Sequence, residues 1–246
     1  MTEPIAWLLP LLLAIGGGDD GVRLTDEVLP PQGELVPERP NLLLELGDPL
    51  YASGPLREGF EIPTGAVWQP SLLVFGQYRT AVQTFDSGPS TRTEWANRLD
   101  LFANLQLSGT ERFFLGLRPL DDNGRFTGYT FEPDSLEGGR SEFNLRPSHF
   151  FFEGDFGELF PGLDRDDSGA LDIGFSVGRQ PILLQDGLLV NDRIDSLVVT
   201  RNTAFAKNVS NLRVSGLVGW NDLERGNNVQ TSDSQIVGLL VEADRE

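Results

Sequence analysis

The sequence has no cysteine, one histidine, one methionine and far fewer basic than acidic residues. Without cysteine there can be neither a disulfide framework nor a thiolate metal site. Its 19 Lys and Arg against 37 Asp and Glu give a formal net charge of −18. A surface that binds nucleic acid needs a basic excess, so the composition argues against a nucleic-acid partner.

Long apolar runs are also scarce, and the longest is IAWLLPLLLAI at Ile5–Ile15. A helix needs about 20 residues to span a bilayer, so this run is too short. Its length fits the core of a secretory signal peptide, with Ala14 and Gly16 small enough for a cleavage site. The sequence therefore predicts a signal peptide over 1–16, although MTEP lacks the usual basic residues. The alternatives are a buried segment or a misassigned start.

Proline and glycine are plentiful up to about Pro70, in stretches such as LPPQGELVPERP. Proline at this density interrupts hydrogen-bonded ladders. Residues 17–70 are predicted to be an acidic N-terminal linker, mostly extended.

From residue 71 onward the pattern is that of β-strands. In LLVFGQYRTAVQTF, Leu72, Val74 and Tyr78 alternate with Gln77 and Arg79, and period-two alternation indicates a strand with one apolar and one polar face. Further alternating or apolar segments predict strands at 95–108, 112–118, 141–151, 171–180, 193–201, 211–220 and 234–243. The four-residue turn SGTE between the second and third keeps the apolar face through the hairpin. Residues 121–139 read as a long polar loop.

Such alternation fits either a soluble sandwich or a membrane barrel. The polar faces hold Arg with Asp, Asn and Gln, and aromatic residues stand near strand ends, which favours lipid outside and a polar lumen inside. Strands of about ten residues match a tilted transmembrane strand. We therefore expect an all-β, up-and-down antiparallel transmembrane β-barrel over 71–246. About eight strands are visible, and we expect them to be the N-terminal part of a larger barrel.

The segment FSVGRQPILLQDGLLVNDRIDSLVVTR at Phe175–Arg201 resembles the alginate-export and related porin-like families of Gram-negative outer membranes. The positions that carry the resemblance are Gly178-Arg179-Gln180, Asp186-Gly187 and Ile194-Asp195. The chain departs from those families at Leu188, where arginine is usual, and at Ile194, where an aromatic residue is usual. The resemblance covers roughly Leu72–Arg201. It implies passage of a solute, such as an anionic saccharide, across the outer membrane.

The alternation places polar residues on the face expected to line the lumen. These candidate pore-lining residues are Gln77, Arg79, Gln83, Arg98, Asp100, Asn104, Gln106, Arg112, Arg118, Arg179 and Arg213. Arginine inside a pore favours carboxylates and phosphates through paired hydrogen bonds. The alternative is structural pairing of these arginines with Asp100, Asp172 and Asp195.

The segment DRDDSGALD resembles the start of a calcium loop, with Asp164, Asp166 and Ser168 at its first, third and fifth positions and Asp172 at its ninth. The closing glutamate of such a loop is missing. His149, beside Phe150–Phe152, is expected to be structural, because no Ser–His–Asp triad can be placed by spacing.

These observations predict an outer-membrane porin-like channel or exporter that passes small or anionic solutes and has no catalytic activity. Its expected partners are outer-membrane lipid and that solute, with no cofactor unless the calcium loop is real. The alternative is a secreted, soluble β-rich module that binds its target in a calcium-dependent way.

Overall fold

The computed structural model describes residues 41–48, 57–122, 124–165, 169–206, 209–221, 223–224, 230–231 and 233–244. By its contacts the chain divides into Met1–Pro40 and Asn41–Glu246, and the sheet belongs to the second unit. The predicted signal peptide lies outside the described residues.

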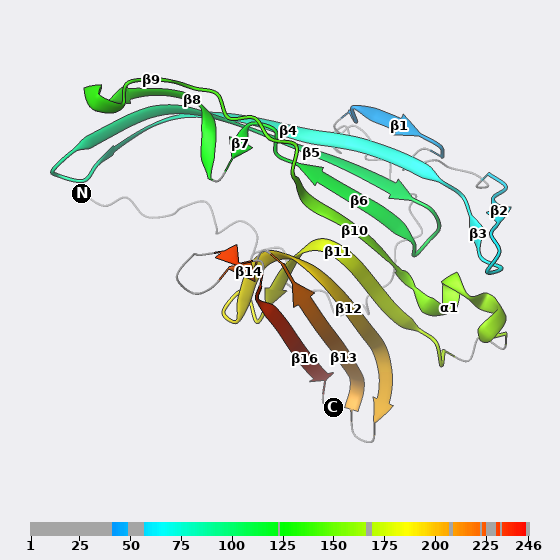
Figure 1. Ribbon diagram of the computed structural model, residues 1–246. Helices are drawn as coiled ribbons and strands as arrows, with labels where there is room; N and C mark the ends of the chain where they lie inside the picture. Colours follow the sequence, from blue (N-terminus) through cyan, green and yellow to red (C-terminus); the bar gives the residue numbers. More distant parts are fainter. Residues whose placement is uncertain are drawn as a thin grey trace, which may run out of the picture. The chain divides into compact units, whose positions relative to one another are not determined.

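The described part of the chain is built from antiparallel strands, as the alternation predicts. The strands of the main sheet are β1 (Leu44–Leu46), β4 (Ser71–Asp86), β5 (Thr91–Gln106), β6 (Arg112–Leu117), β10 (Pro147–Asp155), β11 (Ile173–Leu184), β12 (Val190–Ala206), β13 (Val209–Trp220) and β16 (Gln235–Asp244). They neighbour one another in this order (Figure 1). Among the described residues no ladder joins β16 to β1 or β4, so this part of the sheet is open.

Smaller elements flank the main sheet. They are β2 (Phe60–Glu61), β3 (Val67–Trp68), β7 (Asp121–Asp122), β8 (Arg125–Glu132), β9 (Gly138–Arg140), β14 (Leu223–Glu224), β15 (Gln230–Thr231), the short helix α1 (Phe156–Leu159) and two 3₁₀ turns, Asp134–Leu136 and Pro161–Leu163. No helix in the described ranges is long and apolar enough to cross a membrane.

The structure differs from the sequence-based expectation at three places. Strand β1 pairs with the start of β4, and β2 pairs with β3, inside the segment expected to be a linker. Strand β8 pairs with β5 in the segment expected to be a loop. The strand expected over 141–151 begins only at Pro147, because proline fixes its own φ and has no N–H for a ladder.

Strands β4 and β5 form a long hairpin of 16 residues each, whereas β6 has 6 residues. The far end of the hairpin therefore runs past β6 and is joined there by β8 and β9 (Figure 1). In β4, every residue from Phe75 to Asp86 is exposed. The hairpin is thus part of the main sheet at one end and a projecting ribbon at the other.

Ladder register aligns one apolar residue from each of eight strands in a single row. This apolar row consists of Leu72, Leu105, Phe113, Phe152, Val177, Leu197, Val218 and Val237. Directly paired residues point to the same side of a sheet, so the row defines one face. We call this side the apolar face and the opposite side the polar face.

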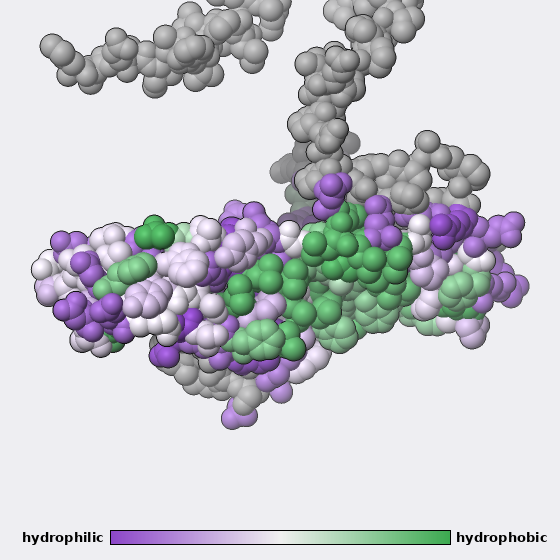
Figure 2. All heavy atoms as spheres, turned by 90° about the horizontal axis from the view of Figure 1, so that it is seen from above, coloured by the Kyte–Doolittle hydropathy of each residue, from purple (hydrophilic) through white to green (hydrophobic). Residues whose placement is uncertain are grey.

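Several members of the apolar row are exposed rather than packed inside the protein. Phe113 is 40% exposed, Val218 46% and Val237 79%. A neighbouring row on the same face adds Val199 at 40% and Leu239 at 73%. Figure 2 shows hydrophobic side chains gathered over the part of the β4–β5 hairpin nearer β6, and more polar residues over its projecting end.

A small core lies on the polar face of the last strands. Ile182, Ile194 and Leu217 are buried there, with Leu184, Val190, Val198 and Ile236 packed against them. Gln180, also buried, donates a hydrogen bond to the Ser196 hydroxyl at 2.9 Å. This part of the polar face is therefore packed mainly with apolar side chains.

Candidate functional site

The β4–β5 ladder places the first predicted pore-lining residues together on the polar face. Gln77 lies opposite Asp100, and Arg79 lies opposite Arg98. Further along β5, Asn104 and Gln106 occupy the same face, because residues two apart on a strand point to the same side. The alternation read from the sequence therefore brings these residues to one surface.

Asp100 is the centre of a cluster of arginines. Its carboxylate is 3% exposed and accepts hydrogen bonds from Arg79 Nη2 at 2.9 Å, Arg98 Nε at 2.8 Å and Arg118 Nε at 3.0 Å. These three guanidinium groups come from β4, from β5 and from the residue after β6. We call Asp100 and its three partners the Asp100 cluster. It carries one negative and three positive charges, so an excess of positive charge remains on the polar face.

The other predicted arginines also have acidic partners. Arg112 Nε lies 2.5 Å from Glu153 Oε1, and Arg213 Nη1 lies 3.5 Å from Glu242 Oε2. The alternative role expected for the arginines is structural pairing with carboxylates, and Asp100 forms such pairs. Glu153 and Glu242 are further partners that the sequence did not suggest. Asp172, a further expected partner, lies just before β11, where its backbone N–H donates to the Gly169 carbonyl at 3.4 Å.

Arg179 occupies a different position from the other predicted pore-lining arginines. The ladder pairs it with Phe150 on one side and Asp195 on the other, in a row of the apolar face. It follows Val177 by two residues, so strict alternation puts both on one side of β11. Arg179 Nη1 lies 3.8 Å from Asp195 Oδ1, and Asp195 also accepts a hydrogen bond from Asn221 Nδ2 at 2.7 Å. Arg179 nevertheless lies in the middle of β11, directly after Gly178, whose φ of +126° interrupts strict alternation at this point of the strand.

The predicted amide residues make local hydrogen bonds. Gln83 Nε2 donates to Glu94 Oε1 at 2.5 Å in the projecting part of the hairpin, where Gln83 is exposed and the Glu94 side chain is 13% exposed. Gln106 Nε2 donates to the Ser108 carbonyl at 2.6 Å and so helps to fix the β5–β6 turn. In that turn Glu111 is 1% exposed and accepts hydrogen bonds from the hydroxyls of Ser108 and Thr110.

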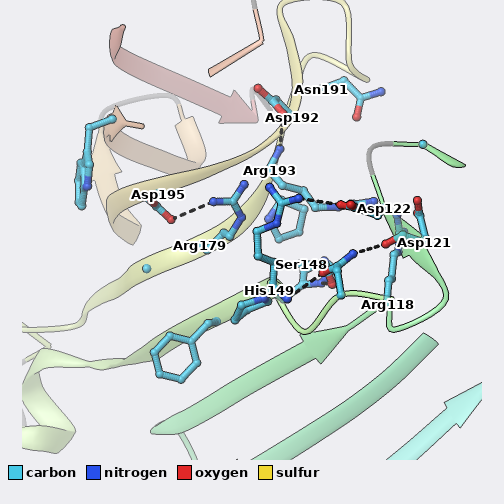
Figure 3. A pocket seen from close by; sticks show the side chains of 18 residues that line it. Arg118, Asp121, Asp122, Ser148, His149, Arg179, Asn191, Asp192, Arg193 and Asp195 are labelled. Atoms are coloured by element: carbon cyan, nitrogen blue, oxygen red, sulfur yellow. Dashed lines mark hydrogen bonds and ion pairs between the residues drawn. The ribbon is translucent and has the colours of Figure 1, made fainter. Parts of the chain in front are cut away.

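A cavity of about 900 Å³ opens where β10, β11 and β12 meet the segment that follows β6. Its charged lining residues are Arg118, Asp121, Asp122, Arg146, Arg179, Asp192, Arg193 and Asp195. Figure 3 shows that these side chains come from separate segments and converge on one space. Two local irregularities shape this region, namely the bulge between Pro147 and His149 and the positive φ of +126° at Gly178.

His149 lies on the wall of this cavity. Its ring packs edge-on against Phe102 and Phe114, with centroids 6.1 Å away in both cases, and its Nδ1 lies 2.9 Å from the Ser148 hydroxyl. It is therefore held by aromatic packing on one side and by a local hydrogen bond on the other.

Arg193 is the cavity residue that the sequence-based reasoning missed. It is partly buried and lies within electrostatic reach of Arg118, Arg98, Asp100 and Asp121. The only signal in the sequence was its place in NDRID as the first residue of the strand expected over 193–201, where it reads as a polar strand end. Its proximity to the Asp100 cluster depends on strands far apart in the chain.

The calcium loop stays a prediction. Asp166 and Ser168 lie outside the described residues, whereas Asp164 and Asp172 lie within them. In the described part of the chain no group of three or more acidic or histidine side chains is arranged to hold a metal ion. Titration calorimetry with calcium tests this loop directly.

No family model, curated protein or solved structure matches this chain.

Proposed function

We propose that this chain forms part of the wall of an outer-membrane channel or exporter that passes small or anionic solutes. The observation that carries the proposal is the apolar row, which crosses eight strands without a polar residue. A lipid-facing barrel surface needs such a band on one face and polar residues on the other.

The distribution of large hydrophobic side chains supports lipid rather than protein as the neighbour of the apolar face. Among the described residues only six hydrophobic side chains are buried, whereas 28 large ones are exposed. A soluble sandwich packs its inward-facing residues between two sheets. Here the remaining sheets of the described part have only two strands each.

The Asp100 cluster supports an anionic solute. It leaves positive charge on the polar face, although most of the guanidinium groups there already contact a carboxylate. Arginines on the inner wall of a pore attract anions and repel cations. The resemblance to alginate-export proteins stays a prediction, and the solute could equally be another small anion of the same charge.

Conductance across a planar lipid bilayer tests the proposal. Purified full-length protein, inserted from detergent, should produce discrete conductance steps and show heat-modifiable migration in gels. Reversal potentials in a salt gradient should show a preference for chloride over potassium. Protein that stays in the soluble fraction without detergent and produces no conductance would point instead to the secreted module.

A further inference from the structure

Three of the four arginines that line the cavity are held by carboxylates. Arg118 bonds to Asp100 at 3.0 Å, Arg146 Nη2 lies 2.7 Å from Asp122 Oδ1, and Arg179 lies 3.8 Å from Asp195. In the described part of the chain, no carboxylate lies within ion-pairing distance of the Arg193 guanidinium. Arg193 is therefore the lining arginine whose charge is not already matched by a direct ion pair.

The surroundings of Arg193 favour a negative ligand at this point. The guanidinium groups of Arg118 and Arg98 act on it together with the carboxylates of Asp100 and Asp121, and the Asp100 cluster as a whole carries an excess of positive charge. A guanidinium group presents its N–H donors as a planar fork that matches the two oxygens of a carboxylate. A single carboxylate bound to Arg193 would relieve the repulsion between these cations.

The rest of the lining limits how much negative charge the cavity can accept. Asp121, Asp122, Asp192 and Asp195 contribute four carboxylates to the lining. A ligand with a second carboxylate would bring that group close to at least one of them, because Asp121 and Asp122 lie on one side of the cavity and Asp192 and Asp195 lie apart from them (Figure 3). Like charges at such distances repel, and the repulsion is strongest where water is partly excluded.

We propose that Arg193 is the ligand-binding residue of this cavity and that the cavity takes singly charged carboxylates in preference to ligands with two or more negative charges. As the solute site of a channel this inference rests on the proposed function, whereas the binding itself does not. The residue expected to select anions is then Arg193, near the start of β12, and not the paired arginines of the polar face.

A matched series of six-carbon polyols tests the charge preference. Sorbitol, gluconate and glucarate share a linear hydroxylated chain and carry no, one and two carboxylates. In titration calorimetry on the full chain in detergent, gluconate should bind saturably, glucarate at least tenfold more weakly, and sorbitol without detectable heat. Glucarate binding as tightly as gluconate, or more tightly, would overturn the proposed preference.

Variants test the role of Arg193 itself. Arg193→Gln should abolish gluconate binding, and Arg193→Lys, which keeps the charge but loses the planar fork, should weaken it about tenfold. The matched control is Arg92→Gln, because Arg92 pairs with Glu94 at 3.0 Å in the projecting part of the hairpin. Unchanged gluconate affinity in both Arg193 variants, with the heat-modifiable migration of the parent protein retained, would exclude this residue as the ligand-binding group.

The carboxylates are tested separately from Arg193. Asp121→Asn removes one negative charge from the lining. It should therefore reduce the difference in binding affinity between gluconate and glucarate. If all variants behave as expected but bilayers show no conductance, the cavity binds a monocarboxylate and the channel proposal fails. If conductance is present and gluconate does not bind, the channel proposal stands and this inference fails.

Discussion

Arg98 and Asp100 stand two residues apart on β5, and the Arg98 guanidinium donates to both oxygens of the Asp100 carboxylate, at 2.8 and 2.9 Å. Because strand residues two apart share a face, the extended backbone of β5 brings the two side chains of this pair together within one strand. Arg79 and Arg118 then reach the same carboxylate from neighbouring segments. The Arg98–Asp100 pair thus lies at the centre of the charged side chains on the polar face of the first strands.

Replacement of Asp100 by Asn should lower the free energy of unfolding. It would leave three guanidinium groups close together around a neutral amide, and removal of one partner from a buried ionic group costs about 3–5 kcal/mol. The arginine side chains are 22–52% exposed, so water offsets part of the repulsion. We expect the free energy of unfolding to fall by about 2–3 kcal/mol in urea titrations of the purified protein.

The control for this variant is Asp48→Asn. Asp48 pairs with Arg57 at 3.0 Å, and the Arg57 side chain is 70% exposed. An exposed pair contributes below about 1 kcal/mol, so the control should change stability little. If both variants lose the same unfolding free energy, the Asp100 cluster contributes no more to stability than an exposed ion pair does.

Leu197 on the apolar row provides a test of what this face contacts. It is 39% exposed, and its neighbours in the row are Val177 and Val218. If the face meets lipid, Leu197→Arg should reduce stability in vesicles by about 2–4 kcal/mol and lower the inserted fraction. If it meets water, an arginine there should be tolerated.

Thr84→Arg is the matched control, because Thr84 lies on the same side of the sheet but in the exposed, projecting part of β4. It should insert as well as the parent protein. Equal insertion of both arginine variants would remove the main support for the membrane proposal.

Gly178 is a position where only glycine fits. Its φ of +126° disfavours any side chain, and a Cβ would lie 2.3 Å from the Phe150 carbonyl oxygen on β10. We expect Gly178→Ala to cost about 2–3 kcal/mol of unfolding free energy and to disturb the cavity wall. Tryptophan fluorescence of the protein during urea unfolding measures the loss.

Gly216 is the corresponding control on β13. A Cβ built there meets no atom within 4 Å, and its φ is not in the positive range. Gly216→Ala should leave stability unchanged or slightly higher, because alanine loses less backbone entropy on folding than glycine does. A large loss at Gly216 would mean that something outside the described residues covers that side of β13.

The strands with clear alternation could be predicted from the sequence, and those whose pairing depends on distant residues could not. The hairpin β4–β5 and the turn after it follow from local period-two patterns and from SGTE. Strand β8, in contrast, contains Gly128 and is flanked by glycine and aspartate, which read as a loop. It becomes a strand because Trp95 and Ala96 of β5 pair with Tyr129 and Gly128.

The residues of the candidate site also fall into those that local alternation predicts and those that depend on distant segments. The polar-face position of Arg79, Arg98 and Asp100 follows from alternation alone. Arg179 shares the parity of Val177 but follows Gly178, whose positive φ interrupts the alternation, so its position in the cavity with Arg118 could not be read from the pattern. The cavity around Arg193 could not be foreseen, because it joins segments separated by some seventy residues and depends on a bulge that has no local signature.

Because β5 is longer than β6, the far end of the β4–β5 hairpin would extend beyond a membrane that the main sheet crosses. At about 3.3 Å per residue, the 16-residue strands of the hairpin reach roughly 50 Å, whereas a tilted strand crosses the hydrocarbon core in about 9–11 residues. In a membrane, the Ser87–Gly88 tip would stand clear of the headgroups on one side. An epitope inserted at this tip would therefore be bound by antibody on intact cells if the hairpin points outward, and only after cell lysis if it points toward the periplasm.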